Sequence, residues 1–154
     1  MQPIILCHSS ILSQKTHSAS FGDKMKNLLF YFAAGALAGL ANSLVLWLLG
    51  DLGVTKLLGV SLVPALTSQW IYPRIVWGGI WGLAFVLPFM KSRLISKGLV
   101  LSLLPTIFQL FYVFPKQGHQ GMLGIGLGML TPVFVVALNM VWGFVAGLTI
   151  KVSR

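Results

Sequence analysis

The sequence predicts an all-α integral membrane protein, built as a four-transmembrane-helix antiparallel bundle. Two observations carry this prediction: the 154 residues are 56% hydrophobic and only 8% charged, and four long apolar runs are separated by short connections. Soluble domains contain about 25% charged residues. A helix needs about 20 mainly apolar residues to cross the hydrocarbon core of a bilayer. The mean hydropathy of +0.89 agrees with a chain that has lipid as its solvent.

The four expected spans differ in length. They cover about residues 28–50, 74–90, 98–114 and 123–150. The second and third are short, and the fourth is long, with Pro132 near its beginning, where a helix tolerates proline. The connection 51–73 is itself apolar, so we expect an interfacial or re-entrant segment there, anchored by aromatic residues.

The N-terminal residues 1–24 form a Ser-rich, weakly patterned stretch that is expected to be a disordered tail. The sequence Met25-Lys26-Asn27 resembles a second chain start. We therefore hypothesise that translation begins at Met25 and that residues 25–154 form one transmembrane domain. The first apolar run continues well past the small residues of a possible signal-peptide cleavage point, which favours an uncleaved anchor.

The basic residues are distributed unevenly between the two sides of the expected bundle. The tail, the connection between the second and third spans, and the C-terminus hold Lys15, Lys24, Lys26, Lys91, Arg93, Lys97, Lys151 and Arg154. The opposite side holds only Lys56, Arg74 and Lys116. The positive-inside rule then predicts a cell inner-membrane protein with both termini in the cytoplasm. These clusters explain the net charge of +9, so no nucleic-acid partner is expected.

Small residues four apart recur along the spans and mark expected helix-packing faces, because membrane helices associate through close backbone approach. Three spans carry such pairs: Gly35 and Gly39, Gly78 and Gly82, and Gly143 and Gly147. The third span has a weaker version in Gly98 and Ser102. The second and fourth spans share the pattern VWGxxxGL, which either duplication of a hairpin or convergence on good packing explains.

A polar residue lies one helical turn beyond each of these faces, where positions three or four apart share a side of the helix. These residues are Asn42, Arg74 and Asn139, and on the third span Thr106 followed by Gln109 one turn later. The helical rise places Asn42, Arg74, Gln109 and Asn139 in the outer half of the membrane. They can stabilise packing through interhelical hydrogen bonds, at about 0.6 kcal/mol each. Alternatively they line a ligand-binding site, because intramembrane polar groups often serve function.

The chain has two acids, Asp23 and Asp51, and Asp51 decides between these interpretations. Asp51 leaves the first span on the same side as Arg74 and could pair with it. In that case the polar cluster is structural. If the pair does not form, Arg74 has no protein counter-ion and favours an external anion such as a lipid phosphate or a carboxylate.

The scarcity of acids also excludes catalysis by paired carboxylates and proton transport through a buried acid. The three histidines are scattered, so no metal or other cofactor is expected. The glycines at 124, 126 and 128 lack the further glycine and the strand–helix context of a nucleotide loop. Four aromatic residues, Trp70, Tyr72, Trp77 and Trp81, suit either a substrate lining or interfacial anchors.

Two functions compete. The first is a small membrane protein acting by interaction, as a subunit, assembly factor or lipid-associated scaffold, with membrane lipids and a protein partner or a second copy of the chain as partners. It rests on short loops and on glycine-rich surfaces suited to helix contacts. The alternative is an oligomeric small permease or channel for a neutral or anionic solute through the outer polar cluster. No enzymatic activity is expected.

Overall fold

A computed structural model of the chain describes residues 4–90 and 92–153, with side chains from residue 22 onward except at 117. The chain divides into two units, Met1–Phe30 and Tyr31–Arg154, and each is described by itself. In the described residues every regular element is helical, without strands. The expectation of an all-α chain is therefore confirmed.

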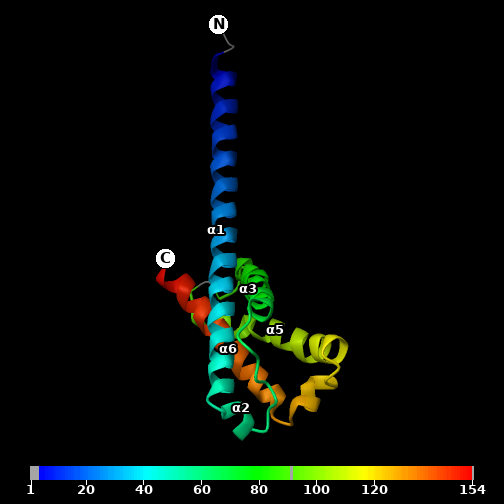
Figure 1. Cartoon of the computed structure of the whole chain (residues 1–154). Helices are drawn as coiled ribbons and strands as arrows, with labels where there is room; N and C mark the ends of the chain where they lie inside the picture. Colours follow the sequence, from blue (N-terminus) through cyan, green and yellow to red (C-terminus); the bar gives the residue numbers. More distant parts are fainter. Residues whose placement is uncertain (1–3, 91, 154) are drawn as a thin grey trace. The chain divides into compact units, whose positions relative to one another are not determined.

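The elements follow one another from the N-terminus in the colour order of Figure 1. The α-helices are α1 (Ile4–Asp51), α2 (Val54–Leu57), α3 (Ser68–Gly82), α4 (Leu94–Leu101), α5 (Leu103–Phe108) and α6 (Thr131–Val152). Two 3-10 helices, η1 (Leu83–Val86) and η3 (Met122–Leu127), and one π-helix, η2 (Gln109–Gln117), complete the described chain.

The first unit consists of the N-terminal part of α1, which is helical from Ile4. Residues 4–24, which the sequence places in a disordered tail, lie within this helix. The side chains described in this unit, residues 22–30, are exposed or partly exposed. A chain start at Met25 stays a prediction.

Among the described residues, three helices are long and apolar enough to cross a membrane. They are Gly22–Asp51 in α1, Leu94–Lys116 through α4, α5 and η2, and Thr131–Val152 in α6. They correspond to the first, third and fourth expected spans. The expected start of the fourth span at Leu123 is wrong, because positive φ angles at Leu123 and Gly124 bend the backbone there. The long helix begins at Thr131, with Pro132 in its first turn, where the missing N–H costs nothing.

The helix in the region of the expected second span, 74–90, begins and ends earlier than expected. Helix α3 begins earlier, at Ser68, where the Thr67 hydroxyl accepts a hydrogen bond from the Trp70 backbone N–H at 3.3 Å. It passes into η1 and stops after Val86. Leu87 leaves the helical conformation, with ψ of 133°, because the residue before a proline, here Pro88, disfavours the α region.

The connection between α1 and α3 packs against the segment that precedes α6. The Ser61 backbone N–H donates to the Leu127 carbonyl oxygen at 2.7 Å. The Gly59 carbonyl lies where a Cβ at Gly128 would be. Since Gly128 has φ of 133°, both its conformation and its space require glycine. The interfacial or re-entrant role of residues 51–73 stays a prediction.

Helices α1 and α3 touch through their backbones (Figure 1). A Cβ added at Gly39 would lie 2.6 Å from the Arg74 carbonyl oxygen, and one added at Gly78 would lie 2.7 Å from the Gly35 carbonyl oxygen. A Cβ added at Gly82 would lie 2.9 Å from the Cα of Gly35. No side chain larger than hydrogen fits these positions without a backbone shift, so the glycines permit the contact.

Helices α4 and α6 form a second contact of the same kind. A Cβ added at Gly147 would lie 2.6 Å from the Leu94 carbonyl oxygen, and one at Gly143 would overlap the Gly98 carbonyl. The six glycines singled out in the sequence therefore lie in two helix pairs, α1 with α3 and α4 with α6.

Apolar clusters support these pairs within the second unit. Leu46, Val60, Phe134 and Leu138 are buried together, with Trp70 packed against them. This cluster joins α1 and α6 to the start of α3 and so holds the first turns of α3 in place. A second cluster of Leu110, Phe114 and Val135 joins η2 to α6.

Lys97 is buried, with 2% of its surface exposed, although the sequence counts it among the solvated charges of a loop. Its ammonium group donates to the carbonyl oxygens of Phe85 at 2.7 Å and of Leu87, and it lies 5.0 Å from the ring centre of Phe89. Lys97 thus satisfies the carbonyls left unpaired where η1 ends.

Candidate functional site: a polar cavity among four helical segments

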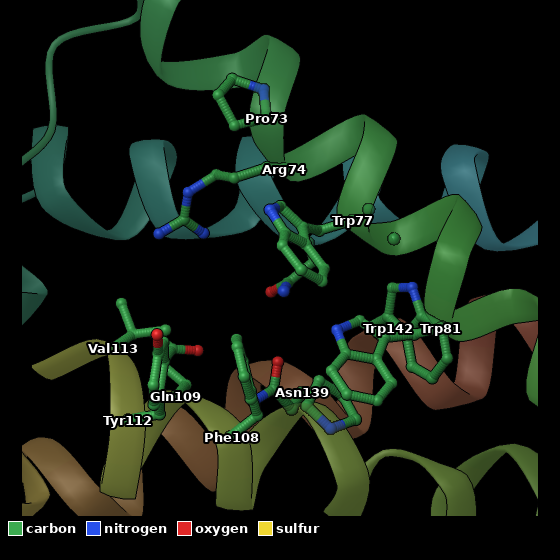
Figure 2. A pocket seen from close by; sticks show the side chains of 14 residues that line it. Pro73, Arg74, Trp77, Trp81, Phe108, Gln109, Tyr112, Val113, Asn139 and Trp142 are labelled. Atoms are coloured by element: carbon green, nitrogen blue, oxygen red, sulfur yellow. The ribbon is translucent and has the colours of Figure 1, made fainter. Parts of the chain in front are cut away.

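A cavity of about 450 Å³ lies among α1, α3, the α5–η2 segment and α6 (Figure 2). All four segments belong to the second unit. Its polar lining consists of Asn42, Arg74, Gln109 and Asn139; its aromatic lining of Trp77, Trp81, Phe108, Tyr112 and Trp142; and its remaining lining of Gly39, Pro73, Gly78, Pro105 and Val113. A volume of this size suits a small organic molecule.

Four of the five polar residues expected to form a cluster meet at this cavity, and Asp51 does not. Asp51 is exposed at the end of α1. It lies nine residues beyond Asn42, which is about 13 Å along the helix. Among the described residues Arg74 forms no ion pair, so the pairing of Asp51 with Arg74 is not formed.

Arg74 is held by the aromatic residue one turn before it in α3. Its guanidinium carbon lies 4.6 Å from the centre of the Trp70 ring, and Trp70 is fixed by the apolar cluster of α1 and α6. Figure 2 shows the guanidinium reaching from α3 into the space opposite Gln109. The guanidinium forms no hydrogen bond or ion pair with the described residues, so its five N–H donors are available to a molecule in the cavity.

The Asn139 side chain is held by its amide nitrogen, and its amide oxygen is left for the cavity. The side chain is 6% exposed, and its Nδ2 donates to the Thr106 hydroxyl at 3.0 Å, while that hydroxyl donates to the Ser102 carbonyl at 2.7 Å. The Asn139 oxygen accepts no hydrogen bond from the described residues. In Figure 2 it faces the cavity from α6.

The carboxamide oxygen of Asn42 is buried and has no hydrogen-bond partner among the described residues. A buried acceptor without a partner costs about 1–3 kcal/mol. Native proteins rarely leave such groups unpaired unless water or a ligand supplies the missing donor. Asn42 lines the cavity, so a small turn of its side chain would bring this oxygen to a donor there.

The aromatic side chains join α3 to α5 and η2 across the cavity. Phe108 lies 5.6 Å from Trp77 and 5.8 Å from Trp81, and it stacks on Tyr112 at 5.0 Å, measured between ring centres. Trp142 closes the α6 side, because its Nε1 donates to the Gly35 carbonyl at 3.0 Å. The indole is therefore fixed to α1 while its ring faces the cavity.

The segment that carries Gln109, Tyr112 and Val113 is the π-helix η2. The Gly118 N–H bonds to the Val113 carbonyl at 3.0 Å, five residues earlier. A π turn is wider than an α turn and is frequent at functional sites. It changes which side chains of this segment face α3.

Part of the aromatic lining is predicted by the sequence. Of the four aromatics considered, Trp77 and Trp81 line the cavity, Trp70 stacks on Arg74, and Tyr72 is 67% exposed and outside it. The missed residues are Phe108, Tyr112 and Trp142. A signal existed for two of them, since Tyr112 and Trp142 follow Gln109 and Asn139 by three positions and share their helix faces.

No known protein family matches the chain, and neither a curated protein nor a solved structure is significantly similar to it. The chemistry of the cavity therefore carries the functional argument. It offers a fixed cation, carboxamides and aromatic faces, which together can bind and orient a ligand.

Proposed function

We propose that this protein is a small multi-pass protein of the inner membrane that binds a small anionic or neutral organic solute in the cavity of its helical bundle. One observation carries the proposal: Arg74 lines the cavity, and no carboxylate of the described residues pairs with it. A basic residue within a membrane helix costs about 2.5–3.5 kcal/mol on insertion scales. The Trp70 stack offsets about 0.5–2 kcal/mol of that, so an anion at Arg74 is favoured.

The proposed topology has four crossings with both termini in the cytoplasm. Three are the long apolar helices of α1, α4 through η2, and α6. We propose α3 with η1 as the remaining crossing, because together they run from Ser68 to Val86, about 29 Å at 1.5 Å per residue. That length is close to the hydrocarbon thickness of about 30 Å. In this orientation Arg74 lies near the outer interface, where it is accessible to an anion.

An interaction role, which the sequence placed first, has less support. It depends on glycine faces that are free to receive a partner helix, and Gly35, Gly39, Gly143 and Gly147 instead contact other helices of the same chain. The large apolar side chains that remain exposed, such as Leu37 and Phe144, suit lipid tails. Recovery of a stoichiometric protein partner would restore the interaction role.

Identifying what the protein retains on purification tests the proposal. The full chain is extracted in native lipid particles, and bound small molecules and lipids are quantified by mass spectrometry for the unmodified protein, Arg74→Gln and Asn139→Leu. Arg93→Gln is the matched control, because Arg93 is exposed and outside the cavity. The unmodified protein and Arg93→Gln should retain a compound that the cavity variants lose. Equal retention by all four proteins would contradict the proposal.

Transport is a separate property of the same site. A compound identified in this way is loaded into proteoliposomes, and its efflux is compared with that from liposomes containing Arg74→Gln. Efflux that depends on Arg74 indicates a permease, in line with the alternative expected from the sequence. Binding without efflux indicates a protein that holds its ligand in the membrane.

A further inference from the structure

The cavity is polar at one end and aromatic at the other. Along α3, Arg74, Trp77 and Trp81 line it in that order, and Trp81 lies about 10 Å further along the helix than Arg74. Opposite Arg74 stands Gln109, whereas Trp142 and Trp81 stand together at the other end (Figure 2). A ligand that matches this lining has a charged head and an apolar body.

Two aromatic residues of the lining are also exposed at the surface of the second unit. Trp77 is 47% exposed and Tyr112 is 49% exposed, although both line the cavity. In the proposed topology that surface faces the lipid tails. Because these two residues both line the cavity and are half exposed, the entrance proposed for a lipid chain lies between α3 and η2.

The size of the cavity limits what it can enclose. About 450 Å³ holds a head group and a short length of hydrocarbon, but it does not hold a two-chain lipid. The rest of a longer ligand must lie outside, along the exposed faces of Trp77 and Tyr112. The unpaired Asn42 oxygen favours a ligand with a hydrogen-bond donor near its head, which this oxygen would accept once the side chain turns toward the cavity.

Resting on the proposed function, we infer that the ligand is a single-chain acidic amphiphile taken from the bilayer. Its carboxylate or phosphate binds the Arg74 guanidinium, and a hydroxyl or amide N–H beside the acid donates to Asn42. Its chain passes along Trp77 and Phe108 and leaves between α3 and η2 into the lipid. Acyl amino acids and monoacyl phosphates share this chemistry.

Fluorescence quenching of Trp77, which is half exposed where the chain is proposed to leave the cavity, tests the inference. The full chain is placed in phosphatidylcholine nanodiscs and titrated with N-(12-bromododecanoyl)glycine, whose bromine quenches tryptophan. A saturable component that unbrominated N-dodecanoylglycine displaces is expected. Arg74→Gln should raise the dissociation constant at least about tenfold, since a charge-assisted contact is lost. Arg74→Lys should retain part of the affinity, and Arg93→Gln all of it.

Three comparison ligands separate the parts of the inference. The chain-free N-acetylglycine should bind at least about tenfold more weakly, as judged by displacement, because it lacks the contacts of the chain. Binding of N-dodecanoylglycinamide, which has no charge, should not depend on Arg74. N-dodecanoyl-N-methylglycine should bind more weakly than N-dodecanoylglycine, because its amide has no N–H for Asn42.

The outcomes distinguish this inference from the proposed function. If N-acetylglycine and N-dodecanoylglycine bound equally well and both depended on Arg74, the acyl chain would not contribute to binding. That result would overturn a ligand taken from the bilayer, whereas the proposed binding of a small solute would stand. Equal binding of the acid and its glycinamide would overturn the acidic head. Absence of any saturable binding by a folded protein would overturn the amphiphile, and the proposed function would then stand or fall on the retained-compound experiment. Circular dichroism and the thermal midpoint show whether each variant is folded.

Discussion

The guanidinium carbon of Arg74 lies 4.6 Å from the centre of the Trp70 ring, one helical turn earlier in α3. Trp70 packs against the buried Leu46, Phe134 and Leu138, so the charge is oriented by a side chain that the core of the unit holds. The five N–H donors of Arg74 form no hydrogen bond with the described residues. This relationship makes the arginine available to a ligand at low conformational cost.

Asp51→Asn should have little effect on stability. Asp51 is exposed and does not pair with Arg74, and surface substitutions of this kind usually change the free energy of unfolding by no more than about 0.5 kcal/mol. The measurement is the thermal midpoint in detergent, together with retention of the bound compound. A loss of either in Asp51→Asn would show that the carboxylate supports the site.

Gly39→Ala should weaken the contact between α1 and α3. The added methyl group would lie 2.6 Å from the Arg74 carbonyl oxygen, so the backbones must separate at a cost of about 1–3 kcal/mol. Gly22→Ala is the control, because no atom lies within 4 Å of its added Cβ and alanine favours a helix by up to about 1 kcal/mol. In chemical denaturation in mixed micelles, the free energy of unfolding should fall for Gly39→Ala and not for Gly22→Ala. Equal stability of the two variants would contradict this contact.

The hydrogen bond from Asn139 to Thr106 should appear as a coupling energy. A double-mutant cycle of Asn139→Ala and Thr106→Val, followed by unfolding in mixed micelles, should give about 0.6 kcal/mol in favour of the pair, with about 1.7 kcal/mol as the upper end for membrane helices. A coupling of zero would mean that α5 and α6 are not joined through these side chains.

Lys97→Met should destabilise the protein although it removes a buried charge. The Phe85 and Leu87 carbonyls lose a charged donor, and hydrogen bonds to charged groups contribute about 1.5–3 kcal/mol. Arg93→Met is the control at a nearby exposed position. Amine acetylation followed by mass spectrometry gives a second readout, in which exposed Lys56 and Lys151 react and Lys97 does so only after unfolding. Equal reactivity of the three lysines in the folded protein would contradict the burial.

Much of the cavity could be predicted because helix geometry carries information along a single segment. Residues three and four apart share a face, so Asn42 follows Gly39, and Asn139 precedes Gly143, on the faces that contact other helices. The rise per residue then places the polar groups at similar depths. No tertiary information is needed for either step.

The remaining features depend on contacts between segments. The sequence does not show that α1 packs on α3 and α4 on α6, because every glycine face is compatible with every other. Lys97 is a surface residue by composition and becomes buried only because the end of η1 offers it two carbonyls. The π-helical turn that carries Gln109 has no composition signal, and the start of the last helix depends on the backbone at Leu123 and Gly124.

The central claim is that Arg74 binds an external anion in place of a protein carboxylate, and a crystal structure of the protein grown from lipid with N-(12-bromododecanoyl)glycine tests it most directly. The account predicts density for the carboxylate about 3 Å from the guanidinium nitrogens of Arg74, with the anomalous bromine peak outside the cavity between α3 and η2. A structure in which Asp51 occupies that position beside Arg74, and the cavity holds no ligand, would contradict it.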